Sequence, residues 1–251
     1  MPISFEWRAD EAMKQLTFRD RPRRDGKRRK KPGRKPSPSA GVPHTARPDH
    51  SRWNPVHVTL RGTKGLPSFR QQLIYHSFER ALRLTRRPDF RIVEYSIQHD
   101  HVHLIIEADD KDALARGMKS FSVRANRLFN VASGRRRGSV WSGRYHRSDL
   151  KSPRQVRNAL AYCLNNARKH RVITNQGLVI DPCSSARWFA GWSLPRTARE
   201  GPSPAEPART ALLRYLWQKH GLIHPTETPG IRPAHDDSHR SAKGDLHRAR
   251  H

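Results

Sequence analysis

One stretch, residues 99–106, limits the folds open to this chain more than any other. It reads His-Asp-His-Val-His-Leu-Ile-Ile, and side chains two residues apart in a strand lie on the same face. His101 and His103 then form a pair on one face, while the aliphatic residues that alternate with them point into a core. Two neutral imidazoles at this spacing can share a divalent cation, although a lone His-x-His pair is more often simply half-exposed.

A second polar pair lies in segment 158–166. Tyr162 and Asn166 are four residues apart, so in a helix they share one face. The apolar stripe of this helix runs through other positions, and core packing therefore does not explain Tyr162. A single such tyrosine is usually a packed aromatic with a solvated hydroxyl. Beside a metal, however, a phenol that can attack and an amide oxygen that can bind a cation indicate phosphodiester chemistry through a covalent intermediate.

The composition favours a polyanionic partner. The chain has 50 Lys and Arg against 22 Asp and Glu, a net charge of +28, and such an excess is typical of nucleic-acid binding. Hydrophobic residues make up 34% of the chain, so part of it is expected to have no core. No apolar run approaches the roughly 20 residues of a membrane span, and the N-terminus lacks the apolar stretch of a signal peptide. The two cysteines form neither a disulfide framework nor a zinc site. We expect an intracellular protein in a reducing compartment.

Charge and turn residues divide the chain into three parts. Residues 1–51 form a basic segment that is expected to be largely disordered, and its run Arg28, Arg29, Lys30 and Arg34 is interpreted as a phosphate-binding tail. Residues 52–172 carry the regular hydrophobic patterns of a folded domain. Residues 173–251 form an extension with a short helix near 208–220, otherwise irregular.

The hydrophobic periods within 52–172 predict an α+β fold. The expected order is a strand from 56, a helix over 67–86, strands over 90–98 and 101–108, a helix over 110–131, a strand over 140–145 and a helix over 152–170. This β-α-β-β-α-β order followed by a further helix predicts an antiparallel sheet of ferredoxin-like topology, with the Tyr162 helix packed on it.

Four separated features resemble one known family. The hairpin with its His-Val-His strand, the helix over 121–130, the strand over 138–145 and the Tyr-x-x-x-Asn helix resemble the REP-associated tyrosine transposases. These bacterial, insertion-sequence transposase-like proteins belong to the single-tyrosine branch of the HUH endonuclease superfamily. The resemblance covers about 52–172 in the right order.

The resemblance implies a specific chemistry. His101, His103 and Asn166 would bind Mg²⁺ or Mn²⁺, and Tyr162 would be the nucleophile. The implied substrate is single-stranded DNA beside a small hairpin, cut to leave a 5′-phosphotyrosine link and a free 3′-hydroxyl. Phenols have a pKa of about 10 and are poor nucleophiles at neutral pH, so a cation on the scissile phosphate is needed. The covalent link allows strands to be rejoined.

Other residues have weaker assignments. The candidates for phosphate contacts are Arg135, Arg136, Arg137, Arg144, Arg168 and Lys169, and for each of them a solvated charge is an equally good interpretation. Asp100 stands where many family members have Asn, and His99 either assists the metal or the tyrosine or closes a turn. Asn165 beside Asn166 leaves open which amide reaches the metal, although the four-residue spacing favours Asn166.

Two other functions remain open at this stage. A non-catalytic nucleic-acid-binding protein on the same fold would account for the charge equally well. A replication initiator or relaxase of the same superfamily would share the site, but the chain lacks a helicase-sized segment. The expected location is the bacterial cytoplasm, at the nucleoid when bound to DNA. The sequence leaves open whether the chain acts as a monomer or a homodimer.

Overall fold

The computed structural model describes residues 47–169, 179–194 and 201–227. The chain divides into two compact units, 1–43 and 44–251, and every described residue belongs to the second. The predicted basic tail, with Arg28, Arg29, Lys30 and Arg34, lies outside the described residues.

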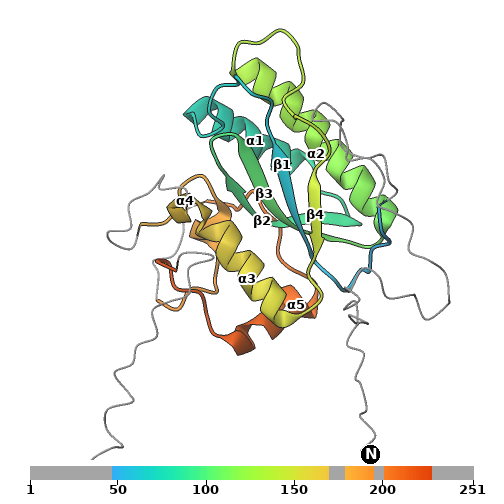
Figure 1. The fold of residues 1–251 in the computed structure, drawn as a ribbon, viewed down its shortest axis with the longest axis vertical. Coiled ribbons are helices and arrows are strands. Elements are labelled where there is room, and N and C mark those ends of the chain that lie inside the picture. Colours follow the sequence, from blue (N-terminus) through green and yellow to red (C-terminus); the bar gives the residue numbers. More distant parts are fainter. Residues whose placement is uncertain (1–46, 170–178, 195–200, 228–251) are drawn as a thin grey trace, which may run out of the picture. The chain divides into compact units, whose positions relative to one another are not determined.

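A four-stranded antiparallel sheet lies at the centre of the described part (Figure 1). Its strands are β1 (Val56–Arg61), β2 (Phe90–Ile97), β3 (His101–Ala108) and β4 (His146–Asp149), in the order β2-β3-β1-β4. The helices are α1 (Gln72–Leu84), α2 (Lys111–Ala132), α3 (Pro153–Leu164), α4 (Asn166–Lys169) and α5 (Ala211–Arg214), with 3₁₀ turns at Ser185–Trp188 and Leu216–His220. This order and strand arrangement confirm the predicted α+β, ferredoxin-like topology.

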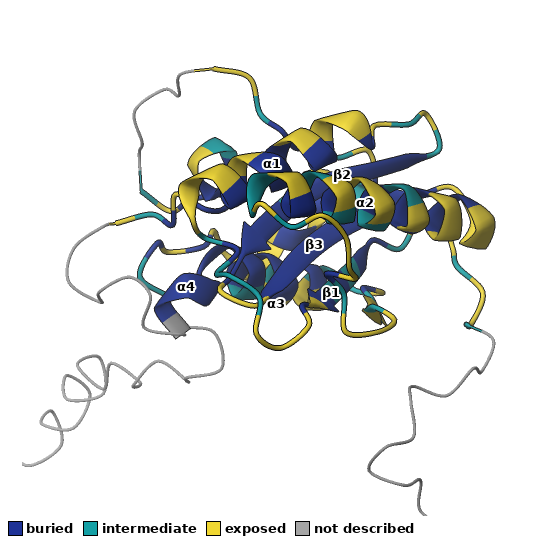
Figure 2. Ribbon diagram, turned by 90° about the horizontal axis from the view of Figure 1, so that it is seen from above, coloured by how far each residue is buried: buried dark blue, intermediate teal, exposed yellow. Residues whose placement is uncertain are grey.

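Helices cover both faces of the sheet (Figure 1). Helices α1 and α2 pack on one face over a core that contains Val58, Leu104 and Phe121. Helix α3 and the C-terminal segments pack on the other face over a second core that contains Ile105 and Leu160. Figure 2 shows the outer faces of α1 and α2 exposed and the strands between the layers buried. The sheet is therefore the middle layer of three.

The alternation in β1 and β3 determines which side chains face α3. Val56, Val58 and Leu60 are at most 2% exposed in the α1–α2 core, so the residues between them point the other way. Thr59 lies opposite His103 in β3 and opposite His146 in β4. A row of polar side chains from three strands therefore lies on the face that α3 covers.

The fourth strand begins later than the sequence predicts. We expected a strand over 140–145, but β4 is His146–Asp149, and Trp141 forms only an isolated bridge with Gly62. The reason is that the predicted segment bonds to α2: the Val140 amide donates to Asn126 Oδ1 at 2.7 Å, and Trp141 Nε1 donates to the Ser122 carbonyl at 3.0 Å. These bonds hold the segment against α2, and its pairing with the sheet is limited to a few backbone bonds at the end of β1, from the Thr63 amide to the Val140 carbonyl and from the Ser142 amide to the Arg61 carbonyl.

Two helix boundaries also differ from expectation. Helix α1 begins at Gln72, and the Phe69 amide before it bonds to the His99 carbonyl. The helix expected over 152–170 stops at Leu164, with Asn165 at its C-terminus, and resumes as α4. Its start is as predicted, because Ser152 accepts from the Gln155 amide and Pro153 opens the first turn.

The C-terminal segments form part of the folded unit. Phe189, Trp192, Leu213 and Trp217 are buried against α3, and the Ile97 amide of the edge strand β2 donates to the Cys183 carbonyl at 2.8 Å. The helix predicted near 208–220 is present as α5 and a 3₁₀ turn, separated at Tyr215. Across the described ranges, no helix has the length and apolar character needed to cross a bilayer.

Candidate active site

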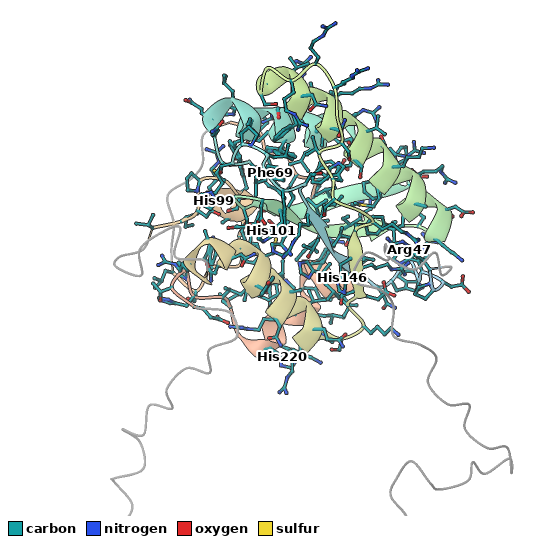
Figure 3. All side chains as sticks on the ribbon, turned by 45° about the horizontal axis from the view of Figure 1, so that its top comes forward. Arg47, Phe69, His99, His101, His146 and His220 are labelled. Carbon is teal, nitrogen blue, oxygen red and sulfur yellow. The ribbon has the colours of Figure 1, made fainter. Side chains whose placement is uncertain are left out.

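The two β3 histidines lie side by side under α3. The ring centroids of His101 and His103 are 4.8 Å apart, and the residues are 9% and 3% exposed. Helix α3 is held against this strand by its apolar stripe and by Cys163, whose Sγ lies 4.0 Å from the His103 carbonyl oxygen. The strand alternation thus brings both imidazoles to the covered face, and Figure 3 shows His101 close to α3.

Each of these histidines has a partner for its Nδ1 atom. His101 Nδ1 lies 2.7 Å from Asp100 Oδ1, and this hydrogen bond is the main cause that lowers the pKa of the Asp100 carboxyl. His103 Nδ1 lies 3.1 Å from Thr59 Oγ1 and 3.2 Å from His57 Nε2. An imidazole that donates from Nδ1 carries its lone pair on Nε2. Acceptors of this kind fix the tautomer and orientation of metal-binding histidines.

Tyr162 lies directly against the histidines. Its ring centroid is 5.2 Å from that of His103 and 5.7 Å from that of His57, with edge-on geometry in both pairs. The residue is half-buried on α3, away from the stripe formed by Val156, Leu160 and Leu164. The phenol expected from the sequence to act as the nucleophile therefore shares a face of the molecule with the histidine pair.

The two neighbouring asparagines have different surroundings. Asn165 Nδ2 donates to the His224 carbonyl at 3.1 Å and so anchors the C-terminal segment. Asn166 is fully buried, and neither its Oδ1 nor its Nδ2 has a hydrogen-bond partner among the described residues. Buried polar atoms of this kind are costly and need a reason. Of the two amides left open by the sequence, that of Asn166 is the one without a hydrogen-bond partner in the described part of the chain.

The donor set fits a hard to borderline divalent cation. Two imidazoles and one amide oxygen suit Mg²⁺ or Mn²⁺, which take mixed nitrogen and oxygen ligands. The unpartnered amide of Asn166 is the structural observation that agrees with such a role. Among residues 47–169, 179–194 and 201–227, no three His, Cys, Asp or Glu side chains are grouped as a metal site. The proposed ligands His101, His103 and Asn166 differ from such a group because one of the three is an amide.

His57 is a site residue that the sequence reasoning did not single out. It stacks on His103 with a centroid separation of 5.2 Å and contacts Tyr162. Burial, with a smaller contribution from nearby His146, lowers the pKa of His57 to about 4, so the ring is neutral at neutral pH. The signal was present in the alternation with Val56 and Val58, which places His57 on the polar face of β1.

His99 lies at the turn, away from the imidazole pair. It is exposed, and its Nδ1 lies 2.9 Å from Ser68 Oγ while its carbonyl accepts from the Phe69 amide. Of the two interpretations made from the sequence, the structure supports the one in which His99 closes the turn. Figure 3 shows the separation of His99 from His101.

The predicted phosphate-binding residues have different environments. Arg136, Arg137 and Arg144 are exposed, and Arg135 is half-buried. Arg168 is 2% exposed, and it donates from Nε to the Pro225 carbonyl at 2.8 Å and from a terminal nitrogen to the Val179 carbonyl at 2.6 Å. This arginine holds the C-terminal segment in place, and its assignment as a phosphate contact stays a prediction. The side chain of Lys169 lies outside the described residues.

Comparisons with known proteins give a family for the central region. Residues 56–166 match the family model described as "Transposase IS200 like". A solved structure of a REP-associated tyrosine transposase bound to a REP hairpin is similar over 57% of this chain and 82% of that chain, with 17% sequence identity and a TM-score of 0.45. No curated protein matches the chain. The matched residues run from β1 through Tyr162 to Asn166, so the similarity to the IS200-like transposases covers the part of the chain that carries the candidate site.

Proposed function

We propose that this chain cuts and rejoins single-stranded DNA beside a hairpin through a phosphotyrosine intermediate, with Tyr162 as the nucleophile and a divalent cation as cofactor. The observation that carries the proposal is the contact between the Tyr162 and His103 rings at 5.2 Å. A packed aromatic would not need two histidines with oriented Nδ1 atoms beside it. The transposase family supports DNA as the substrate.

The proposed reaction is a transesterification. The Tyr162 oxygen forms a bond to the scissile phosphorus, the bond from phosphorus to the 3′ oxygen breaks, the phenolic proton passes to solvent and the released 3′ oxygen takes up a proton. Attack by another 3′-hydroxyl on the phosphotyrosine reverses the exchange and joins two strands. Since each step exchanges one phosphate ester for another, no external energy source is required.

The chain's own residues position the reacting groups. His101, His103 and Asn166 would hold Mg²⁺ or Mn²⁺, which when bound supplies charge neutralisation to the phosphate oxygens. Asp100 and Thr59 orient the two imidazoles. The C-terminal segments keep α3 seated on β3, and with it the phenol next to the histidines.

A covalent trapping assay tests the proposal. The protein is incubated with a labelled hairpin oligonucleotide, taken from any palindromic repeats that flank its gene, and Mn²⁺, and the covalent protein–DNA adduct is quantified under denaturing conditions. Tyr162→Phe and EDTA should each abolish the adduct. Tyr215→Phe is the matched control, because Tyr215 is 56% exposed and lies outside the site. Full adduct formation by Tyr162→Phe, or binding without cleavage by the unaltered protein across many hairpins, would favour a DNA-binding role without catalysis.

A further inference from the structure

Gln98 lies on the side of the sheet that faces α3, next to the histidine pair. Strand β2 ends at Ile97, and the backbone amide of Gln98 donates to the His101 carbonyl at 2.9 Å across the turn to β3. Ile97 and Val102 pair with each other one step further along the two strands, and both are buried in the core under α1 and α2. Because side chains alternate between the two faces of a strand, Gln98 and His101 both point toward α3.

The Gln98 side chain is buried, and its carboxamide is held in one orientation. The residue is 1% exposed, and its Nε2 donates to Ser96 Oγ at 2.7 Å. Ser96 lies opposite His103 in the register of β2 and β3, so this bond holds the carboxamide along β2 toward the level of His103. Its Oε1 is buried and has no hydrogen-bond partner among the described residues. A fixed amide oxygen therefore lies beside the two imidazoles with its lone pairs unused.

The polar contacts at the outer edge of β2 do not involve this oxygen. Residues 183–185 cover that edge through backbone pairing with β2. Arg70 donates to the Ile97 carbonyl at 2.9 Å and binds both carboxylate oxygens of Asp181, at 3.0 and 2.7 Å. The donors of this guanidinium are thus used by other acceptors. A buried acceptor left out of such a network is costly, and it calls for a ligand or another explanation.

The unpaired state of a buried amide does not by itself identify a metal ligand. Asn130 in α2 is 8% exposed and also has an Oδ1 atom without a partner among the described residues. Its Nδ2 donates to the Gly138 carbonyl at 3.0 Å, on the side of the sheet that α2 covers. Gln98 differs from Asn130 in its position, because it shares the side of the sheet that α3 covers with two imidazoles, and the unpaired amide of Asn166 follows α3 directly.

We propose that Gln98 Oε1 is a further ligand of the divalent cation, alongside the two β3 histidines and Asn166. The protein then supplies two imidazole nitrogens and two amide oxygens. Oxygen ligands suit Mg²⁺ and Mn²⁺, whereas imidazoles also suit Zn²⁺ and Cu²⁺, so the second amide oxygen biases the site toward the harder ions. The inference rests on the proposed function for the presence of the cation, and it adds a residue that the sequence reasoning did not single out.

Calorimetric titration of the metal-free full chain with Mn²⁺ and with Zn²⁺ tests the inference without any assay of activity. Gln98→Met keeps a long unbranched side chain and removes the oxygen. It should bind Mn²⁺ at least about 10-fold more weakly, since even the outer-shell partners of metal ligands are worth about 10–100-fold, and it should lose less affinity for Zn²⁺. Water-proton relaxation should show an additional water on the Mn²⁺ bound to this variant. Asn130→Leu is the matched control, because it removes an unpaired buried amide from the other side of the sheet, and it should bind Mn²⁺ like the unaltered chain.

Gln98→Glu provides a second readout, which serves if Gln98→Met does not fold. The variant keeps an oxygen and adds a negative charge, and a buried carboxylate without a counter-ion is costly. Its melting temperature in EDTA should therefore lie below that of the unaltered chain. A Mn²⁺ titration should then raise the melting temperature of Gln98→Glu by more than that of the unaltered chain. If Gln98 had only a structural role, the variant would be equally destabilised with and without Mn²⁺.

Unchanged Mn²⁺ affinity and hydration in Gln98→Met, or equal stabilisation of Gln98→Glu and the unaltered chain by Mn²⁺, would overturn the inference. If the unaltered chain still binds Mn²⁺ and forms its covalent adduct, such a result removes only Gln98 from the site. If the unaltered chain binds no Mn²⁺ and forms no adduct, the proposed function fails as well, so the two failures are distinguishable.

Discussion

Asn166 gives the sharpest prediction, because metal binding and fold stability should place opposite demands on it. Its side chain is fully buried, and both polar atoms lack a hydrogen-bond partner among the described residues. An unsatisfied buried polar group costs about 1–3 kcal/mol. Asn166→Leu keeps the branched shape of the side chain and removes that cost. In EDTA the variant should therefore be more stable than the unaltered protein by about 2 kcal/mol, or roughly 4–8 °C in melting temperature for a chain of this size.

Mn²⁺ should remove this advantage. A cation at 100 times its dissociation constant stabilises the folded state by about 2.7 kcal/mol, and Asn166→Leu lacks one of the three proposed ligands. Thermal melts by calorimetry or circular dichroism, with EDTA and then with a Mn²⁺ titration, measure both effects without any assay of activity. The melting temperature of the unaltered protein should rise with Mn²⁺, and that of the variant should rise much less.

The neighbouring residue provides the matched control. Asn165→Leu removes the partly buried bond from Asn165 Nδ2 to the His224 carbonyl, so it should destabilise the protein by about 0.5–1.5 kcal/mol with or without metal. If Asn166→Leu instead lowers the melting temperature in EDTA as Asn165→Leu does, the Asn166 amide has a structural role, and the reasoning from its unpaired state is wrong.

Three further outcomes are expected. Asp100→Ala should weaken Mn²⁺ binding by about 10–100-fold in a calorimetric titration, because it removes the acceptor that orients His101. Asp100→Asn keeps an acceptor oxygen and should lose less affinity. Equal affinity for the unaltered protein and both variants would contradict the orienting role. Burial raises the pKa of Cys183 from 9.0 to about 11. At pH 8 its thiolate fraction is therefore about 100-fold below that of a cysteine whose pKa is 9.0. A thiol reagent should react with Cys183 at a correspondingly lower rate until denaturant is added or the pH approaches 11. Trp217→Ala should lower the free energy of unfolding by about 3–5 kcal/mol, since Trp217 is 2% exposed and stacks on Phe189. A loss of less than about 1 kcal/mol in a denaturant melt would mean that the C-terminal segment does not stabilise the fold.

The prediction for Trp217 concerns the link between the C-terminal segments and the candidate site. The apolar side of helix α3 shares one buried cluster with Ile105 of the sheet and with Phe189, Trp192 and Trp217. Arg168 and Asn165 bond to carbonyls of the same C-terminal region. A chain shortened before residue 179 would expose the apolar side of α3. The position of Tyr162 relative to His103 therefore depends on residues far beyond the family match.

The sequence determined the local periods and, through them, the topology. Alternation in residues 56–60 and 101–106 assigns one face of each strand to a core, because the side-chain period of a strand is two. The same period places His101 and His103 together, and the cues at Ser152 and Pro153 start α3 where it begins. These features depend on neighbours within a few residues, which is why the sequence alone predicts them.

Tertiary structure decided what depends on contacts between distant segments. Bonds from Val140 and Trp141 hold that segment against α2, and the fourth strand forms at 146–149 instead. Bonds to the carbonyls of Val179 and Pro225 accompany the burial of Arg168, which the sequence suggested as a surface cation. The pairing of β1 with β3 brought His57 and Thr59 to His103, and the break at Asn165 separated one satisfied amide from one unsatisfied one. Long-range packing and hydrogen bonding, which no local pattern encodes, fixed each of these outcomes.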